Sequence, residues 1–102
     1  MHRPGCDPDA MTEGDFLCDF CGRDWSSAQP FVEGHHGSCV CGDCLRAALA
    51  AEQADAPEFR CNLCLETRTD LALACADARL CRRCRDRSAR ALERDPESGW
   101  KR

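Results

Sequence analysis

Four Cys-x-x-Cys pairs dominate the chemistry that this sequence could perform. They lie in FLCDFCGRDW, CVCGDCLRAAL, FRCNLCLETR and RLCRRCRDRSA, in a chain of 102 residues with 11 cysteines. Thiols at this spacing hold metal ions, exchange disulfides or form cross-links. The paired cysteines are Cys18, Cys21, Cys41, Cys44, Cys61, Cys64, Cys81 and Cys84.

The start of the chain favours metal binding over a disulfide framework. The segment MHRPGCDPDAMTEGDFLCDF lacks the apolar stretch and the small-residue cleavage site of a secretory signal. We therefore expect a cytoplasmic protein, in which thiols stay reduced. No segment reaches the roughly 18 consecutive apolar residues of a membrane span, so we expect no membrane partner.

The composition indicates that something besides a hydrophobic core must stabilise the fold. Leu, Ile, Val and Phe together make up only 15 of the 102 residues, below the roughly 20% typical of chains that fold unaided. Structural zinc sites supply about 10 to 16 kcal/mol in small peptides. We therefore predict that removing the metal unfolds the protein.

The cysteines form an internal repeat. The first pair of the first unit recurs after 43 residues, and its second pair recurs after 40 residues. Each unit contains a Cys-x-x-Cys knuckle, a hairpin-length segment and a second Cys-x-x-Cys pair that opens a helix. This order predicts a small, metal-stabilised α+β fold of tandem treble-clef-like zinc fingers. The predicted parts are a flexible segment at 1–15, a first zinc module at 16–57, a second at 58–96 and a tail at 97–102.

Strong helix formers follow the second pair of each unit. In the first unit GDCLRAALAAEQADAP predicts a helix that continues until Pro57, and in the second RRCRDRSARALERDP predicts one that ends at Pro96. After the first knuckle Gly22 permits a left-handed turn, whereas Leu65 in the second predicts a less regular knuckle. Trp100 stands alone, and we expect it to pack loosely or to contact a partner.

Four cysteines per unit complete a tetrahedral zinc site, so the sequence predicts two Zn²⁺ per chain. Sequential pairing, first pair with second and third with fourth, is favoured because each repeat then contains a whole site; crossed pairing as in a RING domain is the alternative. Iron is an alternative ion for four thiolates. The pattern leaves open the roles of Cys6, Cys39, Cys75, His35 and His36.

The stretch LCDFCGRDWSSAQPFVEGHHGSCVCGDCLRAAL resembles the N-terminal zinc-binding module of the ClpX unfoldase over residues 17–50, with a looser second copy at 60–94. Gly34-His35 stands where that family has Gly-Pro. The resemblance implies treble-clef modules that dimerise and bind adaptor proteins and substrates. The matching positions are Cys18, Phe20, Cys21, Gly22, Phe31, Val32, Gly34, Val40, Cys41 and Cys44.

No ATPase motor accompanies this resemblance. A phosphate-binding loop needs a lysine after its glycine-rich turn, and the single lysine of the chain is Lys101. The sequence contains no evident paired carboxylates, Ser/His/Asp set or open metal site. We therefore expect a protein that is not an enzyme.

Charge is distributed unevenly along the chain. The net charge is -4, but residues 79–102 carry nine basic and four acidic side chains. At helical spacing Arg83, Arg87, Arg90 and Arg94 form a stripe opposite Cys84, Ser88, Ala91 and Leu92. This stripe is a solvated face or a surface for an acidic partner or a nucleic acid.

These observations predict a zinc-binding protein-interaction module of adaptor type, whose partner is another protein. The two units form an internal pseudo-dimer or the chain forms a homodimer, with Ala47, Ala48, Ala50 and Ala51 permitting close helix approach. A nucleic-acid-binding zinc-finger protein that uses the arginine-rich helix is the main alternative. A zinc and thiol redox switch is a further one.

Overall fold

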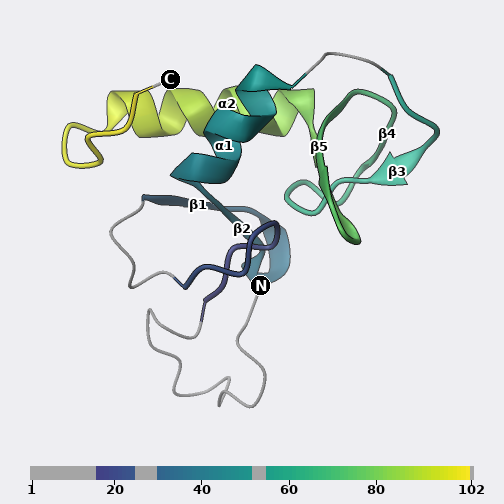
Figure 1. Ribbon diagram of the computed structural model, residues 1–102, viewed down its shortest axis with the longest axis horizontal. Helices are drawn as coiled ribbons and strands as arrows, with labels where there is room; N and C mark the ends of the chain where they lie inside the picture. The colour runs from purple at the N-terminus through teal and green to yellow at the C-terminus, as the bar shows by residue number, and fades with distance from the viewer. Residues whose placement is uncertain (1–15, 25–29, 52–54, 102) are drawn as a thin grey trace.

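The computed structural model describes residues 16–24, 30–51 and 55–101 and has a small α+β fold (Figure 1). The α+β class predicted from the repeat is therefore confirmed. The elements are β1 (Phe31–Glu33), a short 3₁₀ helix (His35–Gly37), β2 (Cys39–Cys41), α1 (Gly42–Ala50), β3 (Phe59–Arg60), β4 (Thr67–Arg68), β5 (Leu71–Cys75), β6 (Ala78–Cys81) and α2 (Arg82–Arg94).

Each unit contains an antiparallel hairpin that leads directly into a helix. Val32 on β1 lies opposite Val40 on β2, and Leu73 on β5 lies opposite Leu80 on β6. The last strand residue of each hairpin, Cys41 or Cys81, is also the N-cap of the following helix. The chain therefore passes from strand to helix at a cysteine in both units.

The first helix is shorter than predicted. It ends at Ala50, and the next residue has the extended backbone angles φ -71° and ψ 152°. Beyond Leu49 no large apolar residue occurs until Phe59, so a longer helix would have no face to bury, and propensity alone does not sustain a short helix. The second helix ends at Arg94, two residues before Pro96.

Both knuckles have the same left-handed turn. The φ angles are 78° at Gly22 and 61° at Leu65. In each case the backbone N–H at this position donates to the carbonyl of the first knuckle cysteine, Cys18 or Cys61, at 2.9 Å. The prediction of a less regular second knuckle was wrong, because the local bonds impose the turn on a residue that disfavours it by about 1–2 kcal/mol.

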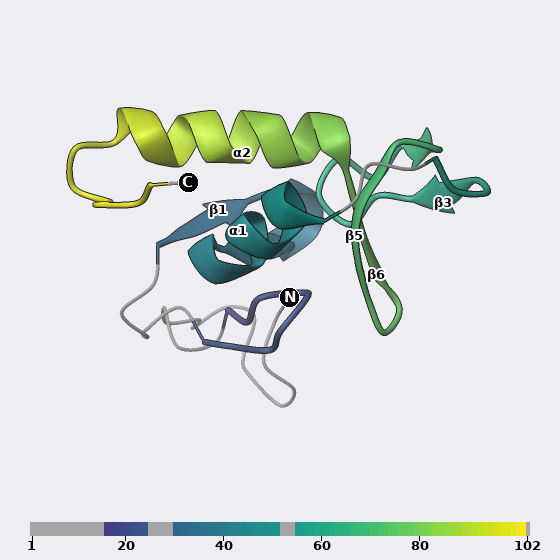
Figure 2. The ribbon, with the colours of Figure 1, turned by 45° about the horizontal axis from the view of Figure 1, so that its top comes forward.

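One hydrophobic core extends through both units. Leu45, Leu80 and Val40 are fully buried, and the same cluster includes Leu63 of the second knuckle and Leu92 of α2. Figure 2 shows α2 running along the first unit beside α1 and β1, and both of these elements contact α2. The two units therefore share one core.

Hydrogen bonds also join the units. The His35 N–H donates to the Leu63 carbonyl at 2.8 Å, and Asn62 Nδ2 donates to Asp19 Oδ2 at 3.1 Å. A Cβ added to Gly34 would lie 2.7 Å from both Cα and O of Leu63. The second knuckle thus packs against the first hairpin more closely than a side chain at position 34 would allow.

Trp100 is buried, contrary to the expectation of loose packing. It is 4% exposed, its Nε1 donates to the Gly42 carbonyl at 2.9 Å, and the Arg46 guanidinium lies 5.4 Å from the ring centroid. Arg46 Nε also donates to the Lys101 carbonyl. The end of the chain is therefore fastened to the start of α1.

The helices of the described segments are too short and too polar to cross a membrane.

Replacing Gly34 by Ala tests the contact between the units. We expect Gly34→Ala to lower the free energy of unfolding by about 1–3 kcal/mol, because the new methyl group meets rigid knuckle backbone. The exposed α1 substitution Ala47→Ser is the control. Chemical denaturation with metal bound measures the effect, and equal stability of the two variants would contradict the close packing.

Replacing Trp100 by Ala tests the attachment of the chain end. We expect the free energy of unfolding to fall by about 3–5 kcal/mol, because this substitution removes a large, buried aromatic side chain. Trp100→Phe keeps most of the ring but lacks the donor to Gly42, so its loss should be about 1 kcal/mol. Equal effects of the two substitutions would show that the packing of the ring contributes little.

Candidate metal centres

The structure assembles the eight paired cysteines into two groups of four. In each group the four Sγ atoms all lie within 4.8 Å of one another. The grouping is sequential, so each repeat contains one complete group. The first comprises Cys18, Cys21, Cys41 and Cys44, and the second comprises Cys61, Cys64, Cys81 and Cys84.

The separations of the sulfurs fit tetrahedral coordination. In the first group Cys18 Sγ lies 3.8 Å from Cys44 Sγ, and Cys21 Sγ lies 3.7 Å from Cys41 Sγ. In the second group Cys64 Sγ lies 4.0 Å from Cys81 Sγ. A tetrahedron with metal–sulfur bonds of about 2.3 Å has edges of about 3.8 Å. Each group therefore has the size and donor set for one metal ion.

A repeated set of hydrogen bonds positions the first knuckle of each group on its hairpin. Asp19 Oδ1 accepts from the Cys39 N–H at 3.2 Å, and Asn62 Oδ1 accepts from the Arg79 N–H at 2.9 Å. The backbone N–H groups of Asp19 and Asn62 donate to the carbonyls of the same partners. An acidic or amide side chain after the first cysteine thus fixes the knuckle in both units.

The hairpins also donate to the sulfurs. The Cys41 N–H lies 3.4 Å from Cys18 Sγ, and the Cys81 N–H lies 3.5 Å from Cys61 Sγ. At the start of α2 the Cys84 N–H donates to Cys81 Sγ at 3.4 Å. Such donors stabilise the thiolate form that a metal ion requires.

Hydrogen bonds within the groups divide the thiols into acidic and basic members. Bonding from Cys41 lowers the pKa of Cys18, and bonding from Cys84 lowers the pKa of Cys61 to about 4. A separate contact between Cys18 Sγ and Cys44 Sγ raises the pKa of Cys44. Without a cation each group therefore retains protons on some sulfurs, and a metal ion must displace them to bind four thiolates.

An ion pair connects knuckle to helix beside each group. In the first unit Arg23 Nη1 lies 2.7 Å from Asp43 Oδ2. In the second unit Glu66 pairs with Arg83, and Arg68 Nη1 lies 3.4 Å from the same Glu66 carboxylate.

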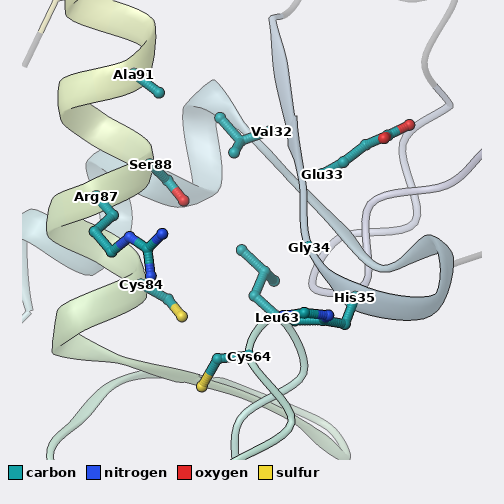
Figure 3. A pocket seen from close by; sticks show the side chains of 10 residues that line it. All are labelled: Val32, Glu33, Gly34, His35, Leu63, Cys64, Cys84, Arg87, Ser88 and Ala91. Carbon is teal, nitrogen blue, oxygen red and sulfur yellow. The ribbon is translucent and has the colours of Figure 1, made fainter.

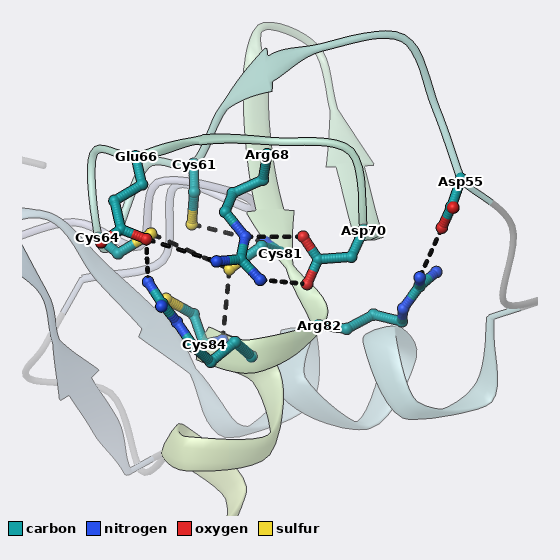
Figure 4. A network of polar contacts seen from close by, with 10 residues as sticks. Asp55, Cys61, Cys64, Glu66, Arg68, Asp70, Cys81, Arg82 and Cys84 are labelled. Carbon is teal, nitrogen blue, oxygen red and sulfur yellow. Dashed lines mark hydrogen bonds and ion pairs between the residues drawn. The ribbon is translucent and has the colours of Figure 1, made fainter.

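The second unit extends this network toward Asp70 (Figure 4). Arg68 Nε lies 2.8 Å from Asp70 Oδ1, and Arg68 Nη2 lies 2.9 Å from Asp70 Oδ2. The bidentate pairing with Arg68 lowers the pKa of Asp70 to about 2. The pKa of the Arg83 guanidinium is raised by Glu66 first and by the Cys64 sulfur second. The second group thus has cationic side chains at its edge.

Among the described side chains, Cys39, Cys75 and His35 lie outside both groups. Cys39 is fully buried, and its Sγ donates to the Leu17 carbonyl at 2.9 Å; burial raises the pKa of this thiol to about 11. Cys75 is half-buried on β5 and packs against the core, and all ten described cysteines are free thiols. Cys6 lies outside the described residues, as does the side chain of His36.

The predicted arginine stripe divides in the structure. Arg83 is half-buried and paired with Glu66, whereas Arg87, Arg90 and Arg94 are exposed on α2. The opposite face was predicted correctly except at one position, since α2 buries Cys84, Ser88, Ala89 and Leu92, and Ala91 is exposed. The helix packs against elements of both units, since it contacts α1 and β1 as well as β5 and β6.

Sequence reasoning missed three contributors to these sites. The knuckle side chains Asp19 and Asn62 and the ion-pair residue Glu66 carry no metal-binding signature of their own. Their signal lies in the repeat: Asp19 and Asn62 occupy equivalent positions, as do Arg23 and Glu66. Comparing non-cysteine positions between the two copies would have found all of them.

Comparisons with known proteins do not identify a relative. The chain matches no protein-family model, no curated protein and no solved structure.

Metal removal tests the two groups directly. We expect two metal ions per chain by elemental analysis and native mass spectrometry, and one ion per chain in Cys18→Ser or Cys61→Ser. A strong chelator should abolish the helical circular dichroism signal, because the small core does not replace the binding free energy of the metal. Cys75→Ser, which lies outside both groups, is the control. A spectrum unchanged by complete metal removal would contradict this prediction.

Proposed function

We propose that this chain is a non-catalytic protein-interaction module held together by two structural zinc ions. The observation that carries the proposal is the pair of complete four-sulfur groups, each joining a knuckle to the junction of a hairpin and a helix. Four thiolates fill the tetrahedral coordination of zinc and leave no position for substrate or water. A closed site of this kind stabilises structure and does not perform catalysis.

Zinc is the ion that this arrangement supports best. The order of knuckle, hairpin and helix is the order proposed for a treble-clef finger, and it occurs in both units. Zinc has no redox chemistry and accepts the tetrahedral donor set without further ligands. Iron in the same site would colour the protein, so visible absorbance of the purified holoprotein separates the two ions.

The residues shared with the ClpX-type module have structural roles in this chain. Phe20 and Phe31 of that pattern are buried in the core, Gly22 forms the left-handed turn and Gly34 makes the close approach to the second unit. These positions therefore serve the fold of the module, and they support the resemblance at the level of architecture.

We also propose that the two units form an internal pseudo-dimer. Asp19 and Asn62, which are equivalent in the repeat, bond directly to each other, and α1 contacts α2. A contact between equivalent residues is expected near a two-fold axis. Of the four alanines expected to permit close helix approach, Ala48 is fully buried, whereas Ala47 and Ala50 are exposed and Ala51 is half-buried.

A cavity between the units provides a place for a partner. Its volume is about 370 Å³, and its lining comes from β1, the second knuckle and α2 (Figure 3). Val32, Leu63 and Ala91 supply an apolar lining, and Arg87 lies on the helix side. Figure 3 shows the Glu33 side chain pointing away from α2. The cavity thus combines apolar walls with a guanidinium at one side.

The partner that fits this surface is a protein segment with an aliphatic side chain beside carboxylates. The aliphatic group fills the cavity, and the carboxylates face Arg87, Arg90 and Arg94. Within the described residues none of these three arginines has an acidic side chain within ion-pair distance. Guanidinium groups bind carboxylates through two parallel hydrogen bonds, which gives both affinity and direction.

Nucleic-acid binding has less support. Exposed arginines on one helix favour it, but the formal charge of the chain is -4, and each four-thiolate zinc site adds about -2. Affinity for nucleic acid comes largely from phosphate neutralisation by a positive surface. A peptide with a few carboxylates can pair with the three arginines. The acidic remainder of the chain repels such a peptide less than it repels a long polyphosphate backbone.

A peptide library tests the partner class. We expect zinc-loaded protein to select peptides with Leu or Val flanked by Asp or Glu, and Arg87→Glu to weaken their binding about 10-fold or more by fluorescence anisotropy, since desolvated charge pairs lose several kcal/mol when reversed. Arg60→Glu makes the same charge change at an exposed site outside the cavity and should leave binding unchanged.

A labelled DNA duplex and a labelled RNA strand provide the comparison. Tighter binding of either nucleic acid than of the peptides, lost in Arg87→Glu and retained in Arg60→Glu, would overturn the protein-partner proposal in favour of the nucleic-acid alternative. Failure of Arg87→Glu to weaken peptide binding would show that the cavity is not the docking site.

A further inference from the structure

A chain of three hydrogen bonds connects the two hairpins through the two knuckles. The Cys39 N–H donates to Asp19 Oδ1 at 3.2 Å, and the Arg79 N–H donates to Asn62 Oδ1 at 2.9 Å. Between them Asn62 Nδ2 donates to Asp19 Oδ2 at 3.1 Å. Each bond uses a different side-chain oxygen or nitrogen, so all three coexist in one arrangement. We call Asp19 and Asn62 the knuckle link.

Only one orientation of the Asn62 amide makes this arrangement. A rotated amide would place its oxygen against the Asp19 carboxylate and its N–H groups against the Arg79 N–H. Hydrogen bonds that a carboxylate accepts are also stronger than those between neutral groups. The knuckle link therefore fixes the two knuckles relative to each other, as well as each knuckle on its own hairpin.

The knuckle link lies directly beside the metal ligands. Asp19 follows Cys18, and Asn62 follows Cys61, which are the first cysteines of the two groups. The last two cysteines of each group lie at the start of the following helix, so a bound ion attaches each knuckle to its own helix. An ion in one group thus holds in place the knuckle residue that the other unit uses as a partner.

Further contacts run between the second knuckle and the first hairpin. Leu63 belongs to the second knuckle and is 4% exposed. Its carbonyl accepts from the His35 N–H at 2.8 Å, and its backbone lies against Gly34. The first hairpin ends at the ligand Cys41. Order in the second knuckle therefore stabilises the hairpin that presents a ligand of the first group.

A second connection leads from the end of the chain back to the first group. Trp100 Nε1 donates to the carbonyl of Gly42, which lies between the ligands Cys41 and Cys44. Trp100 follows α2, the helix that begins at the second group. The second unit thus positions the first group both through its knuckle and through the segment after its helix.

We propose that the two metal centres bind their ions cooperatively, and that Asp19 and Asn62 are the positioning residues that carry the coupling. This inference rests on the proposed binding of zinc by both groups. The ion that binds first must order its own knuckle, and the cost of this ordering lowers its apparent affinity. The ordered knuckle then places one half of the knuckle link, so the second ion meets a partly organised site.

The coupling makes the response of the chain to zinc steep. Coupling between two sites is reciprocal, so either centre raises the affinity of the other by the same factor. Chains with a single ion are therefore disfavoured relative to empty and fully loaded chains. The protein passes from the empty to the two-ion form over a narrower range of free zinc than independent sites would allow.

Native mass spectrometry of the full chain tests the cooperativity. The reduced, metal-free protein is titrated with zinc in the presence of a competing chelator, and the populations with no, one and two ions are measured. Independent sites, equal or unequal, leave about half or more of the chains with one ion at half saturation. We expect a one-ion population well below half, since a tenfold coupling of two equal sites leaves about a quarter.

Two single substitutions test the knuckle link. Asn62→Asp keeps the acceptor for the Arg79 N–H and loses the donor to Asp19, whereas Asp19→Asn keeps the acceptor for the Cys39 N–H and presents a second donor to the Asn62 amide. We expect either substitution to raise the one-ion population to about half or more. The two substitutions change the net charge in opposite directions, so charge alone would not explain a shared effect.

The double exchange, Asp19→Asn with Asn62→Asp, rebuilds the link with its donor on the first knuckle. Both hairpin N–H groups keep an oxygen acceptor, and the net charge is unchanged. This variant should restore the low one-ion population, a rescue that separate roles of the two side chains within their own units would not produce. Asp77→Asn alters an exposed carboxylate that lines the same surface hollow as Asp19 and Asn62, and it should behave as the unmodified chain.

The outcomes separate this inference from the proposed function. Binding of fewer than two ions by the unmodified chain at saturating zinc would refute the function proposal. With two ions bound, a one-ion population of half or more, or unchanged cooperativity in both single variants, would refute the inference alone. Zinc content and circular dichroism at saturation show whether each variant is folded and loaded. If neither single variant loads, recovery of loading in the double exchange supports the link, and failure to recover overturns it.

Discussion

Coordination by two groups of four sulfurs is the interaction on which this structure depends. Each group joins a knuckle to the residue where a hairpin becomes a helix, and Cys41 and Cys81 serve as strand end, helix N-cap and ligand at once. A chain with only 15 Leu, Ile, Val and Phe residues among 102 buries too little apolar surface to hold these junctions. We propose that metal coordination supplies the missing stability, so that folding and metal binding become one process.

Packing of the two units against each other determines the usable surface. The second knuckle approaches Gly34 so closely that a methyl group would collide with backbone, and α2 lies along α1 and β1. Trp100 then fastens the chain end to Gly42. The cavity that we propose as a partner site exists only at this junction, since its lining comes from both units.

Around the two sulfur groups the repeat keeps the same hydrogen bonds and differs in its outer side chains. The bonds of Asp19 and Asn62 to the hairpins, and those from Cys41 and Cys81 N–H to sulfur, recur in both copies. The outer ion pair, in contrast, reverses its polarity between the units. Backbone bonds define the geometry that a metal ion requires, whereas outer charges tune how the sulfurs react. The two centres thus share their sulfur geometry and differ in the charges around them.

The sequence by itself determined the four Cys-x-x-Cys pairs and the order of knuckle, hairpin and helix, because both follow from spacing within about 30 residues and from the repeat. It left crossed pairing open, and the tertiary structure decided for sequential groups. Tertiary structure alone decided where α1 ends, that Leu65 adopts the turn of Gly22, and that Trp100 is buried. It also separated Arg83 from Arg87, Arg90 and Arg94 by pairing it with Glu66. Each of these outcomes depends on a partner distant in sequence or on a bond network that local propensity does not encode.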